Sequence, residues 1–551
     1  MDHSHKRNEL AILILLFISL RFFALMLLRP GGFITDFSDF HVSFLPFAQW
    51  SRYGLYPYQD FWMEYPPLLP WMVVAVYKAS LLLPPWDDPR LWFNTLIGLS
   101  VLLFDTGNLV LIYLMGYKLW GWEKGRLTGW IYLGLFATFY TALGWLDNIP
   151  LFFVLLSLYL WIGPSPKLGL IRALLSGASL GMGFMFKVVP ALLLPLGFRA
   201  LKKREFVLCL AGFSIVAGVL AVPFVVLNPD MFITSFRAMM GRSPWETVWA
   251  IMNGYYSYGV IAGDRFSTPE SFAVYPSRIP GLLPLLLWGL IYFWLILRLR
   301  HQGEPSRLVT SASLVFFSYE ALTTGYSPQH IVYFLPFLIL LMPNPIGVAG
   351  AISFTLINLF EAVGYFIIFP EERWLLLMAV LLRTLGLLIL AGICFLKITE
   401  RHLKFGQWAL KAWISLVVLC LAVAIVPLGK EYFQNRLAKT PCAGLQDKLQ
   451  SYEAGINVVF LRGSLYDSLY PYLGRKLRAV LLPESALASS SLEEERLAFF
   501  ERVGIREKFL VIVNQSDPFE VEALNWLEKT FGNGLRVSEA GSCVLMEFDR
   551  E

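Results

Sequence analysis

Long apolar runs alternate with short polar loops along most of the chain. A helix that crosses a membrane needs roughly 20 mainly apolar residues. Residues 10–28 meet this length and lack a small-residue cleavage site after them, so we expect a retained first span rather than a signal peptide. The other expected crossings are residues 91–117, 127–143, 149–162, 173–185, 188–198, 206–227, 280–297, 308–324, 331–342, 346–368, 374–396 and 408–426. The pattern predicts an α-helical polytopic membrane protein with about thirteen transmembrane helices.

Basic residues gather in loops on one predicted side of these spans. Lys6 and Arg7 precede the first span. The later loops on the same side contain Lys118, Lys124, Arg126, Lys167, Arg172, Arg199, Lys202, Lys203, Arg204, Arg298, Arg300, Arg307, Lys397, Arg401 and Lys404. Because cytoplasmic loops carry an excess of Lys and Arg, this bias predicts a cytoplasmic N-terminus. Function is then to be sought in the loops on the outer face.

The apolar run at residues 68–83 decides the topology. If it crossed the membrane, every later basic loop would lie outside, against the charge rule. We therefore predict a non-spanning interfacial helix over residues 66–83, which makes residues 30–90 one long external loop with interfacial helices. Pro66 and Pro67 suit the first turn of that helix.

The pattern changes to that of a soluble domain after Pro427. Predicted strands at residues 456–463, 478–483, 508–514 and 536–548 alternate with predicted helices at residues 464–474, 491–504 and 518–532. We therefore divide the chain into a transmembrane domain, residues 1–429, and a small external α/β domain, residues 430–551. The latter has no glycine-rich nucleotide motif. Cys442 and Cys543 lie near its ends and form either a disulfide or two buried thiols.

Composition agrees with a membrane protein. The chain has 551 residues, of which 57% are hydrophobic and 15% charged, whereas soluble proteins have about a quarter charged residues. The net charge of +5 is explained by the loops that set topology, so no nucleic-acid partner is needed. The 5 cysteines exclude a disulfide scaffold.

The first external loop contains the densest group of candidate chemical residues. Asp36 and Asp39 precede an amphipathic pattern of aromatic residues at helical spacing, which is typical of a helix lying on the membrane surface. Asp39 has two interpretations. It either caps this helix or serves as a general base whose pKa is raised by burial.

Ordered motifs resemble GT-C glycosyltransferases, especially the polyprenyl-phosphate-mannose-dependent branch related to phosphatidylinositol-mannoside mannosyltransferases. GLYPYQDFWMEYPPLLPW at residues 54–71 is similar to a signature of their first external loop. Further similar elements are GWLDNIP around Asp147, FKVVPALLLP at residues 186–195, PWETVWA at residues 244–250 and SPQHIVYFLP at residues 327–336. The resemblance covers residues 10–345 and does not reach the α/β domain.

This resemblance implies a reaction and a set of site residues. The reaction is inverting transfer of a hexose, in this branch mannose, from a polyprenyl-phosphate donor to a hydroxyl of a lipid or glycan acceptor. Asp39 matches the position of the family's catalytic aspartate, but the residues after it depart from the family pattern, so Asp36 stays an alternative. The expected donor-phosphate ligands are Lys187, His330 and Arg90. The expected substrate-binding residues are Glu64, Tyr65, Asp147, Trp245, Glu246 and Trp249.

No metal or other cofactor is expected. The sequence has no HExxH, no paired CxxC and no histidine cluster at ligand spacing. Carboxylates and water can hold a divalent cation, but the resemblance is to a branch that generally works without one. The expected location is a prokaryotic plasma membrane, with the active site and the α/β domain outside the cytoplasm. The expected partners are the lipid-linked donor, the acceptor and membrane lipids.

Charges within the predicted spans support a different hypothesis. In a secondary transporter or lipid flippase, they would form an ion or substrate path through Asp105, Lys187, Glu320, Glu361 and Arg383. Independently of this hypothesis, the alternative to phosphate binding by Lys187 is an ion pair within the bundle with Asp105, Glu320 or Glu361. We instead interpret Glu361 and Arg383 as a structural pair, because isolated intramembrane charges are costly. The absence of similarity between the two halves of the sequence favours the enzyme.

Overall fold

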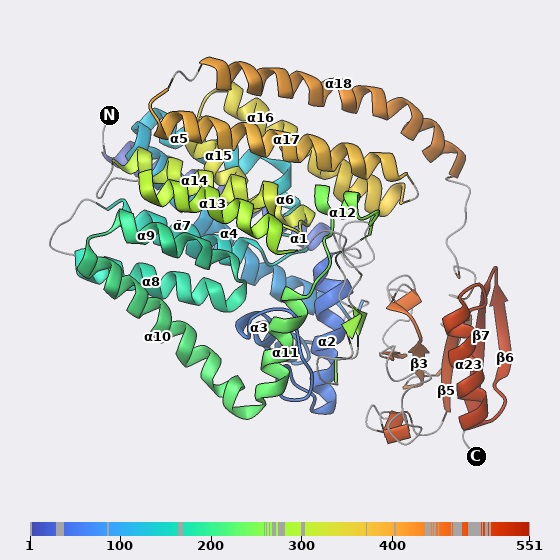
Figure 1. The fold of residues 1–551 in the computed structure, drawn as a ribbon. Coiled ribbons are helices and arrows are strands. Elements are labelled where there is room, and N and C mark those ends of the chain that lie inside the picture. Colours follow the sequence, from blue (N-terminus) through green and yellow to red (C-terminus); the bar gives the residue numbers. More distant parts are fainter. Residues whose placement is uncertain are drawn as a thin grey trace.

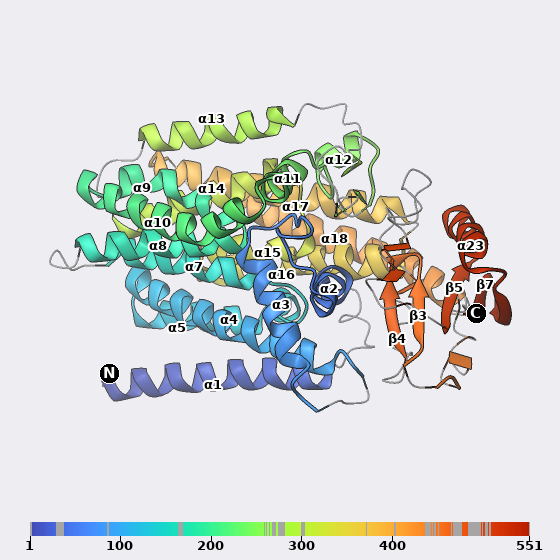
Figure 2. The same ribbon diagram turned by 90° about the horizontal axis from the view of Figure 1, so that it is seen from below.

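The computed structural model shows a helical bundle with a small β-sheet domain at one end (Figures 1 and 2). It describes residues 3–28, 38–84, 88–163, 169–257, 259, 262–263, 265–266, 272–273, 281–298, 304–370, 372–401, 404–435, 442, 445, 448–449, 451–453, 455–463, 465–466, 477–482, 497–498, 500–501, 505 and 508–549. Within these ranges, 7 helices are long and apolar enough to cross a membrane.

The predicted apolar runs coincide closely with helices of the bundle. These are α1 (His3–Leu27), α4 (Leu91–Trp120), α5 (Trp122–Gly134), α6 (Phe136–Thr141), α7 (Asn148–Trp161), α8 (Gly169–Phe186), α9 (Leu194–Ala200), α10 (Lys203–Leu227), α13 (Leu282–Arg298), α14 (Pro305–Leu322), α15 (Ile331–Leu341), α16 (Pro345–Leu359), α17 (Arg373–Ile398) and α18 (Lys404–Asn435). Two short helices that were not predicted, α11 (Pro229–Met240) and α12 (Val248–Met252), lie between α10 and α13. The predicted fold class is confirmed, while the number of crossings stays a prediction.

Several predicted spans are broken or irregular. The run at residues 127–143 is divided between α5 and α6, because the backbone of Leu135 is extended with a ψ of 121°. The run at residues 188–198 begins with the 3₁₀ helix η4 (Val189–Leu193). The run at residues 346–368 ends as the π-helix η7 (Phe360–Ile368). Such irregular turns change the direction of side chains within an otherwise continuous helix and occur frequently at functional sites.

The loop that was predicted to be external folds into short elements beside the bundle. They are the π-helix η1 (Phe40–Phe44), α2 (Leu45–Trp50), the 3₁₀ helix η2 (Ser51–Tyr53) and α3 (Leu68–Ser80). Gly54 ends η2 with a φ of 77°, a left-handed conformation that glycine adopts readily. Helix α3 has 13 residues, fewer than the roughly 20 that a straight crossing needs. Its length agrees with the predicted interfacial helix.

The C-terminal sheet combines parallel and antiparallel strands in the order β4-β3-β5-β7-β6. The strands are β3 (Asn457–Phe460), β4 (Arg478–Leu481), β5 (Lys508–Asn514), β6 (Leu535–Ala540) and β7 (Cys543–Asp549), and α23 (Pro518–Phe531) follows β5. The predicted single strand at residues 536–548 was wrong, since β6 and β7 form a hairpin that turns at Gly541 with a φ of 63°. The predicted helices at residues 464–474 and 491–504 lie mostly outside the described residues.

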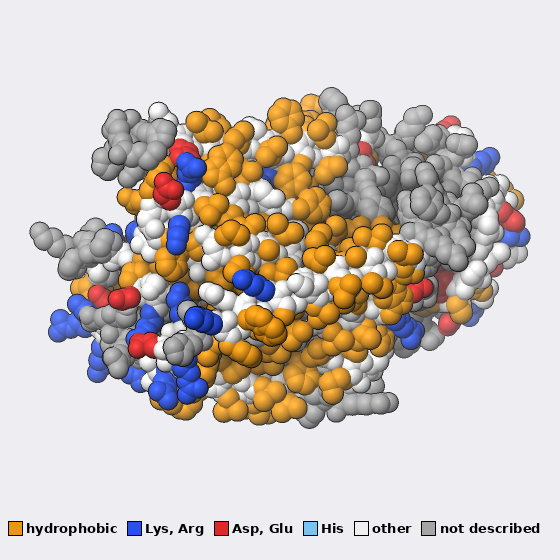
Figure 3. Space-filling view, turned by 90° about the horizontal axis from the view of Figure 1, so that it is seen from above, with side chains coloured by type: hydrophobic (Ala, Val, Ile, Leu, Met, Phe, Trp, Pro, Cys, Tyr) orange, Lys and Arg blue, Asp and Glu red, His pale blue; other side chains and the backbone are white. Residues whose placement is uncertain are grey.

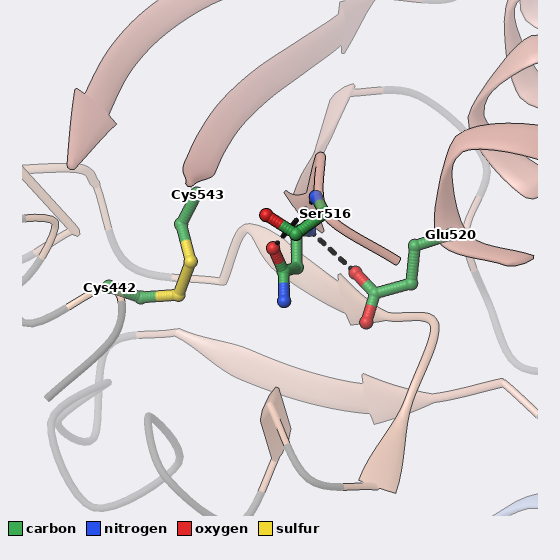
Figure 4. The surroundings of a disulfide bond; sticks show 5 residues. Cys442, Ser516, Glu520 and Cys543 are labelled. Carbon is green, nitrogen blue, oxygen red and sulfur yellow. Dashed lines mark hydrogen bonds between the residues drawn. A yellow bond between two sulfur atoms is a disulfide. The ribbon is translucent and has the colours of Figure 1, made fainter. Parts of the chain in front are cut away.

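A disulfide closes this domain on itself. Cys442, which follows α18, is bonded to Cys543 at the start of β7 (Figure 4). Of the two alternatives left by the sequence, the structure therefore has the disulfide. Beside it, the carboxylate of Glu520 accepts a hydrogen bond from the backbone N–H of Asn514 at 2.7 Å.

The domain contacts α2 and η2 of the first loop. The Tyr466 hydroxyl donates a hydrogen bond to Gln49 Oε1 of α2 at 2.9 Å. Tyr53 of η2 packs against the apolar core of the sheet, which includes Val459 and Phe509. The domain and the loop that carries Asp39 therefore lie at the same end of the molecule.

Surface charge marks the other end of the bundle. Figure 3 shows Lys and Arg side chains gathered at the end opposite the sheet domain, with hydrophobic side chains covering the middle. Helix α10 is long and apolar enough to cross a membrane. Large apolar residues on it, such as Val219, Val222 and Val226, are exposed by more than half of their surface. An exposed apolar surface of this extent is expected of a chain embedded in lipid.

Candidate active site

Asp39 lies at the start of η1 and does not act as a helix cap. Its side chain makes no capping hydrogen bond, so the capping interpretation was wrong. Instead, Asp39 Oδ2 accepts a hydrogen bond from Gln329 Nε2 at 3.4 Å. Burial raises the pKa of Asp39 to about 7, the nearby Asp147 carboxylate adds to this effect, and Lys187 opposes it. A carboxylate that titrates near neutral pH is suited to general-base catalysis.

Lys187 lies between α8 and η4 and binds the turn before α7. Its Nζ donates a hydrogen bond to Asp147 Oδ1 at 2.5 Å and lies 3.4 Å from His330 Nε2. The other ring nitrogen of His330, Nδ1, lies 3.4 Å from Glu320 Oε2. Segments far apart in the sequence therefore bring an ammonium, two carboxylates and an imidazole together.

The alternative ion pairs for Lys187 were mostly wrong. Asp105 pairs with Arg21, whose Nε lies 2.7 Å from Asp105 Oδ2. Glu361 forms an ion pair with Arg383, which confirms the predicted structural pair. Glu320 lies close enough to Lys187 for their charges to interact, but Asp147 is the residue that Lys187 contacts directly.

Glu64 is held by an arginine that the sequence did not identify. Both Nη atoms of Arg265 bind the Glu64 carboxylate. The Arg265 carbonyl also accepts a hydrogen bond from the N–H of Trp62 at 2.9 Å, which ties this segment to the first loop. Burial alone would raise the pKa of Glu64, but Arg265 outweighs it and lowers the pKa. Glu64 is thus a fixed carboxylate, while Tyr65 beside it packs edge-on against Phe44 at 5.5 Å.

The segment before α12 is bound to the turn between α14 and α15. The indole Nε1 of Trp245 donates to Ser327 Oγ at 3.0 Å, and that of Trp249 donates to the Leu322 carbonyl at 2.9 Å. A Cβ on Gly325 would lie 1.9 Å from the Trp245 ring, so this packing requires glycine. The two indoles therefore fix the position of Glu246, which lies between them in the sequence.

Arg242 is a cation of the site that sequence reasoning missed. Its guanidinium lies 3.7 Å from the centre of the Trp245 ring, and its charge interacts with Asp39, Glu64 and Glu246. Its Nε is buried without a hydrogen-bond partner. Lys187 and Arg265 have carboxylate partners, whereas no ion pair to Arg242 occurs within the described part of the chain. Arg242 therefore has hydrogen-bonding capacity for an anionic ligand.

Arg90 contacts residues of the first loop. Arg90 lies at the start of α4, where its Nη2 is 2.9 Å from Asp88 Oδ2. It is also near His41, whose Nε2 lies 3.1 Å from Asn94 Oδ1. Burial and the Arg90 charge lower the pKa of His41 to about 3. These contacts connect Arg90 to the first loop. The alternative base Asp36 lies outside the described residues.

Most of the candidate residues lie together beside the first loop, and the fold is that of an α-helical polytopic membrane protein. The structure of ArnT from Cupriavidus metallidurans bound to undecaprenyl phosphate aligns over 98% of this chain and 97% of its own, with a TM-score of 0.50 and 14% identity. The apo structure of that protein aligns over 97% of each chain, with a TM-score of 0.48 and 14% identity.

The archaeal oligosaccharyltransferase AglB from Archaeoglobus fulgidus, in complex with an inhibitory peptide and a dolichol-phosphate, is a more distant match. It aligns over 98% of this chain and 74% of its own, with a TM-score of 0.33 and 11% identity. No protein-family model matches the chain, and neither does any curated protein. The likeness to undecaprenyl-phosphate-bound ArnT shows the fold alone.

Proposed function

We propose that the protein is an inverting glycosyltransferase that moves a sugar from a polyprenyl-phosphate donor to an acceptor hydroxyl. The observation that carries this proposal is that Asp39, whose pKa is about 7, lies near the cations Lys187 and Arg242. The shared fold supports it, because the ArnT structure holds undecaprenyl phosphate. A lipid-linked donor also explains why such a site belongs to a membrane protein.

The residues of the site divide into groups with different roles. Asp39 removes the proton from the acceptor hydroxyl as that oxygen attacks the anomeric carbon. The bond from this carbon to the phosphate oxygen breaks, and the pair of electrons leaves with the phosphate. Lys187, Arg242 and His330 stabilise the charge on the leaving phosphate. A single displacement inverts the configuration of the anomeric carbon.

The remaining polar residues of the site suit the sugar and the acceptor. Glu64 and Asp147 are held by cations and accept hydrogen bonds from hydroxyl groups, while Tyr65 and the Trp245 and Trp249 rings supply apolar surface. We propose a hexose, with mannose as the first sugar to test, and a lipid or glycan acceptor. The transporter hypothesis receives less support, because Asp105 is bound by Arg21 and by the Tyr132 hydroxyl at 2.6 Å within the bundle.

Release of the lipid carrier tests this function. Purified protein is given a polyprenyl-phosphate hexose and a panel of lipid and glycan acceptors, with and without EDTA. We expect polyprenyl phosphate and a glycosylated acceptor in both conditions, because Lys187 and Arg242 supply the positive charge that stabilises the leaving phosphate. An intact donor with every acceptor would contradict the proposal.

We propose that the site and the C-terminal domain face the outside of a prokaryotic plasma membrane. Cysteines introduced at Gln59, before α3, and at Asp88, after it, should both react with an impermeant maleimide in intact cells. A cysteine at Lys202, in a basic loop, should react only after permeabilisation. Labelling of Gln59→Cys but not of Asp88→Cys would show that α3 crosses the membrane and would overturn this topology.

A further inference from the structure

Glu246 occupies an unusual backbone position beside the candidate site. Its side chain is buried and its φ is 51°, in the left-handed region that residues with a Cβ rarely adopt. Neighbouring bonds hold this conformation: Arg383 donates to the Glu246 carbonyl, Trp245 N–H donates to the Thr324 carbonyl, and Tyr326 N–H donates to the Trp245 carbonyl. Outlying backbone that the surroundings enforce in this way is concentrated at functional sites.

One oxygen of the Glu246 carboxyl group is buried without a hydrogen-bond partner among the described residues. The residue is 2% exposed, and this oxygen is Oε2. The charged groups that act on it are Glu361, Arg383, Arg242 and Asp39. Both cations have other contacts, since Arg383 binds Glu361 and the Arg242 guanidinium lies on the Trp245 ring. A buried polar atom without a partner is costly unless a ligand satisfies it.

We propose that Glu246 is protonated and donates a hydrogen bond from its carboxyl O–H to a hydroxyl of the donor sugar, beside Asp39. This inference rests on the proposed glycosyl transfer. A neutral carboxyl group offers one donor and an acceptor, which matches a sugar hydroxyl that both gives and receives hydrogen bonds. It would therefore determine which sugar the site accepts through the position of that hydroxyl.

The electrostatic surroundings are consistent with this protonation state. Burial raises the pKa of Glu246, and the Glu361 carboxylate adds to this effect, while Arg383 and Arg242 oppose it. Because the pKa of Glu246 is raised, this side chain stays protonated to a higher pH than an exposed glutamate does. It loses its proton as the pH rises through that pKa. Asp39 must lose its proton to act, whereas Glu246 must keep its proton. The two carboxyl groups would then limit activity from opposite sides of the pH range.

Three variants test the inference in the release assay, with kcat/KM measured across pH. Glu246→Ala should lower kcat/KM on the order of 10- to 100-fold, the effect of one lost hydrogen bond to a buried polar group. Glu246→Gln keeps the shape and an N–H donor, so it should recover much of this loss. Glu246→Asp keeps the acid but withdraws it by one methylene, so it should resemble alanine.

The pH profile separates a neutral donor from an ionised one. Glu246→Gln should lose the fall in kcat/KM at alkaline pH and keep the Asp39-dependent rise near pH 7. If Glu246 were ionised, the same change would remove a negative charge near Asp39 and move that rise to lower pH, which would overturn the inference. A folded Glu246→Gln as inactive as Glu246→Ala would also overturn it. A wild-type protein that releases no polyprenyl phosphate would instead refute the proposed function.

Discussion

Replacement of Asp39 by asparagine lowers kcat for sugar transfer by about 10²- to 10⁴-fold, the usual contribution of a general base. Asparagine has nearly the same shape but cannot accept the acceptor's proton at neutral pH. The Gln329 amide can still bond to the side-chain oxygen, so the site should keep its geometry. The measurement is single-turnover release of polyprenyl phosphate by the purified variant.

The control for this change is Asp230→Asn, a carboxylate on the exposed surface of α11. It should retain wild-type kcat, and both variants should elute from size exclusion as the wild type does. Wild-type kcat for Asp39→Asn would contradict the assignment and would make Asp36, outside the described residues, the next candidate for the base.

Replacement of Lys187 by glutamine has two separable effects. Loss of the ammonium removes a donor to the leaving phosphate, which should lower kcat by about 10²- to 10³-fold. It also leaves Asp147 unpaired beside Asp39. Because Lys187 lowers the pKa of Asp39, its removal raises that pKa, and the rise of activity with pH should move upward from about 7.

A full pH profile of Lys187→Gln separates these effects, with Lys404→Gln at the exposed start of α18 as the matched control. The control should leave both kcat and the pH profile as in the wild type. An unchanged profile for Lys187→Gln, or a shift to lower pH, would show that Lys187 does not share an electrostatic environment with Asp39.

The helices were predictable because each depends on a local run of apolar residues. Residues 91–117, for example, needed only their own hydropathy to be placed in α4 (Leu91–Trp120). The break at Leu135 and the π-turns of η7 (Phe360–Ile368) were not predictable, because an apolar run gives no sign of where tertiary packing interrupts a helix. The hairpin at Gly541 was missed for a different reason, since a glycine within an apolar strand also fits a bulge.

Part of the site was predictable from motifs that occur in order along the chain. Asp39, Asp147, Lys187 and His330 come from separate motifs and lie together in the structure. Arg265 was not identified as a site residue from the sequence, because its segment has no regular pattern of hydrophobic residues. Its partner Glu64 is also 201 residues away.

The ion-pair partner of a residue was harder to predict from the sequence than whether that residue belongs to the candidate site. Lys187 had several carboxylates available by sequence, and the choice depended on contacts made elsewhere. Arg21 binds Asp105, Arg383 binds Glu361 and Glu320 lies beside His330, whereas Lys187 contacts Asp147. Only the folded chain shows which charges are already paired, and the same consideration identifies Arg242 as a cation available to a ligand.

A structure of the Asp39→Asn variant with a polyprenyl-phosphate hexose bound tests the central claim most directly. The account predicts that the phosphate lies on Lys187 and Arg242, with the anomeric carbon facing residue 39 across a space for one acceptor hydroxyl, about 3–3.5 Å from the reacting carbon. A donor whose anomeric carbon faces another carboxylate, or whose phosphate binds away from both cations, would contradict it.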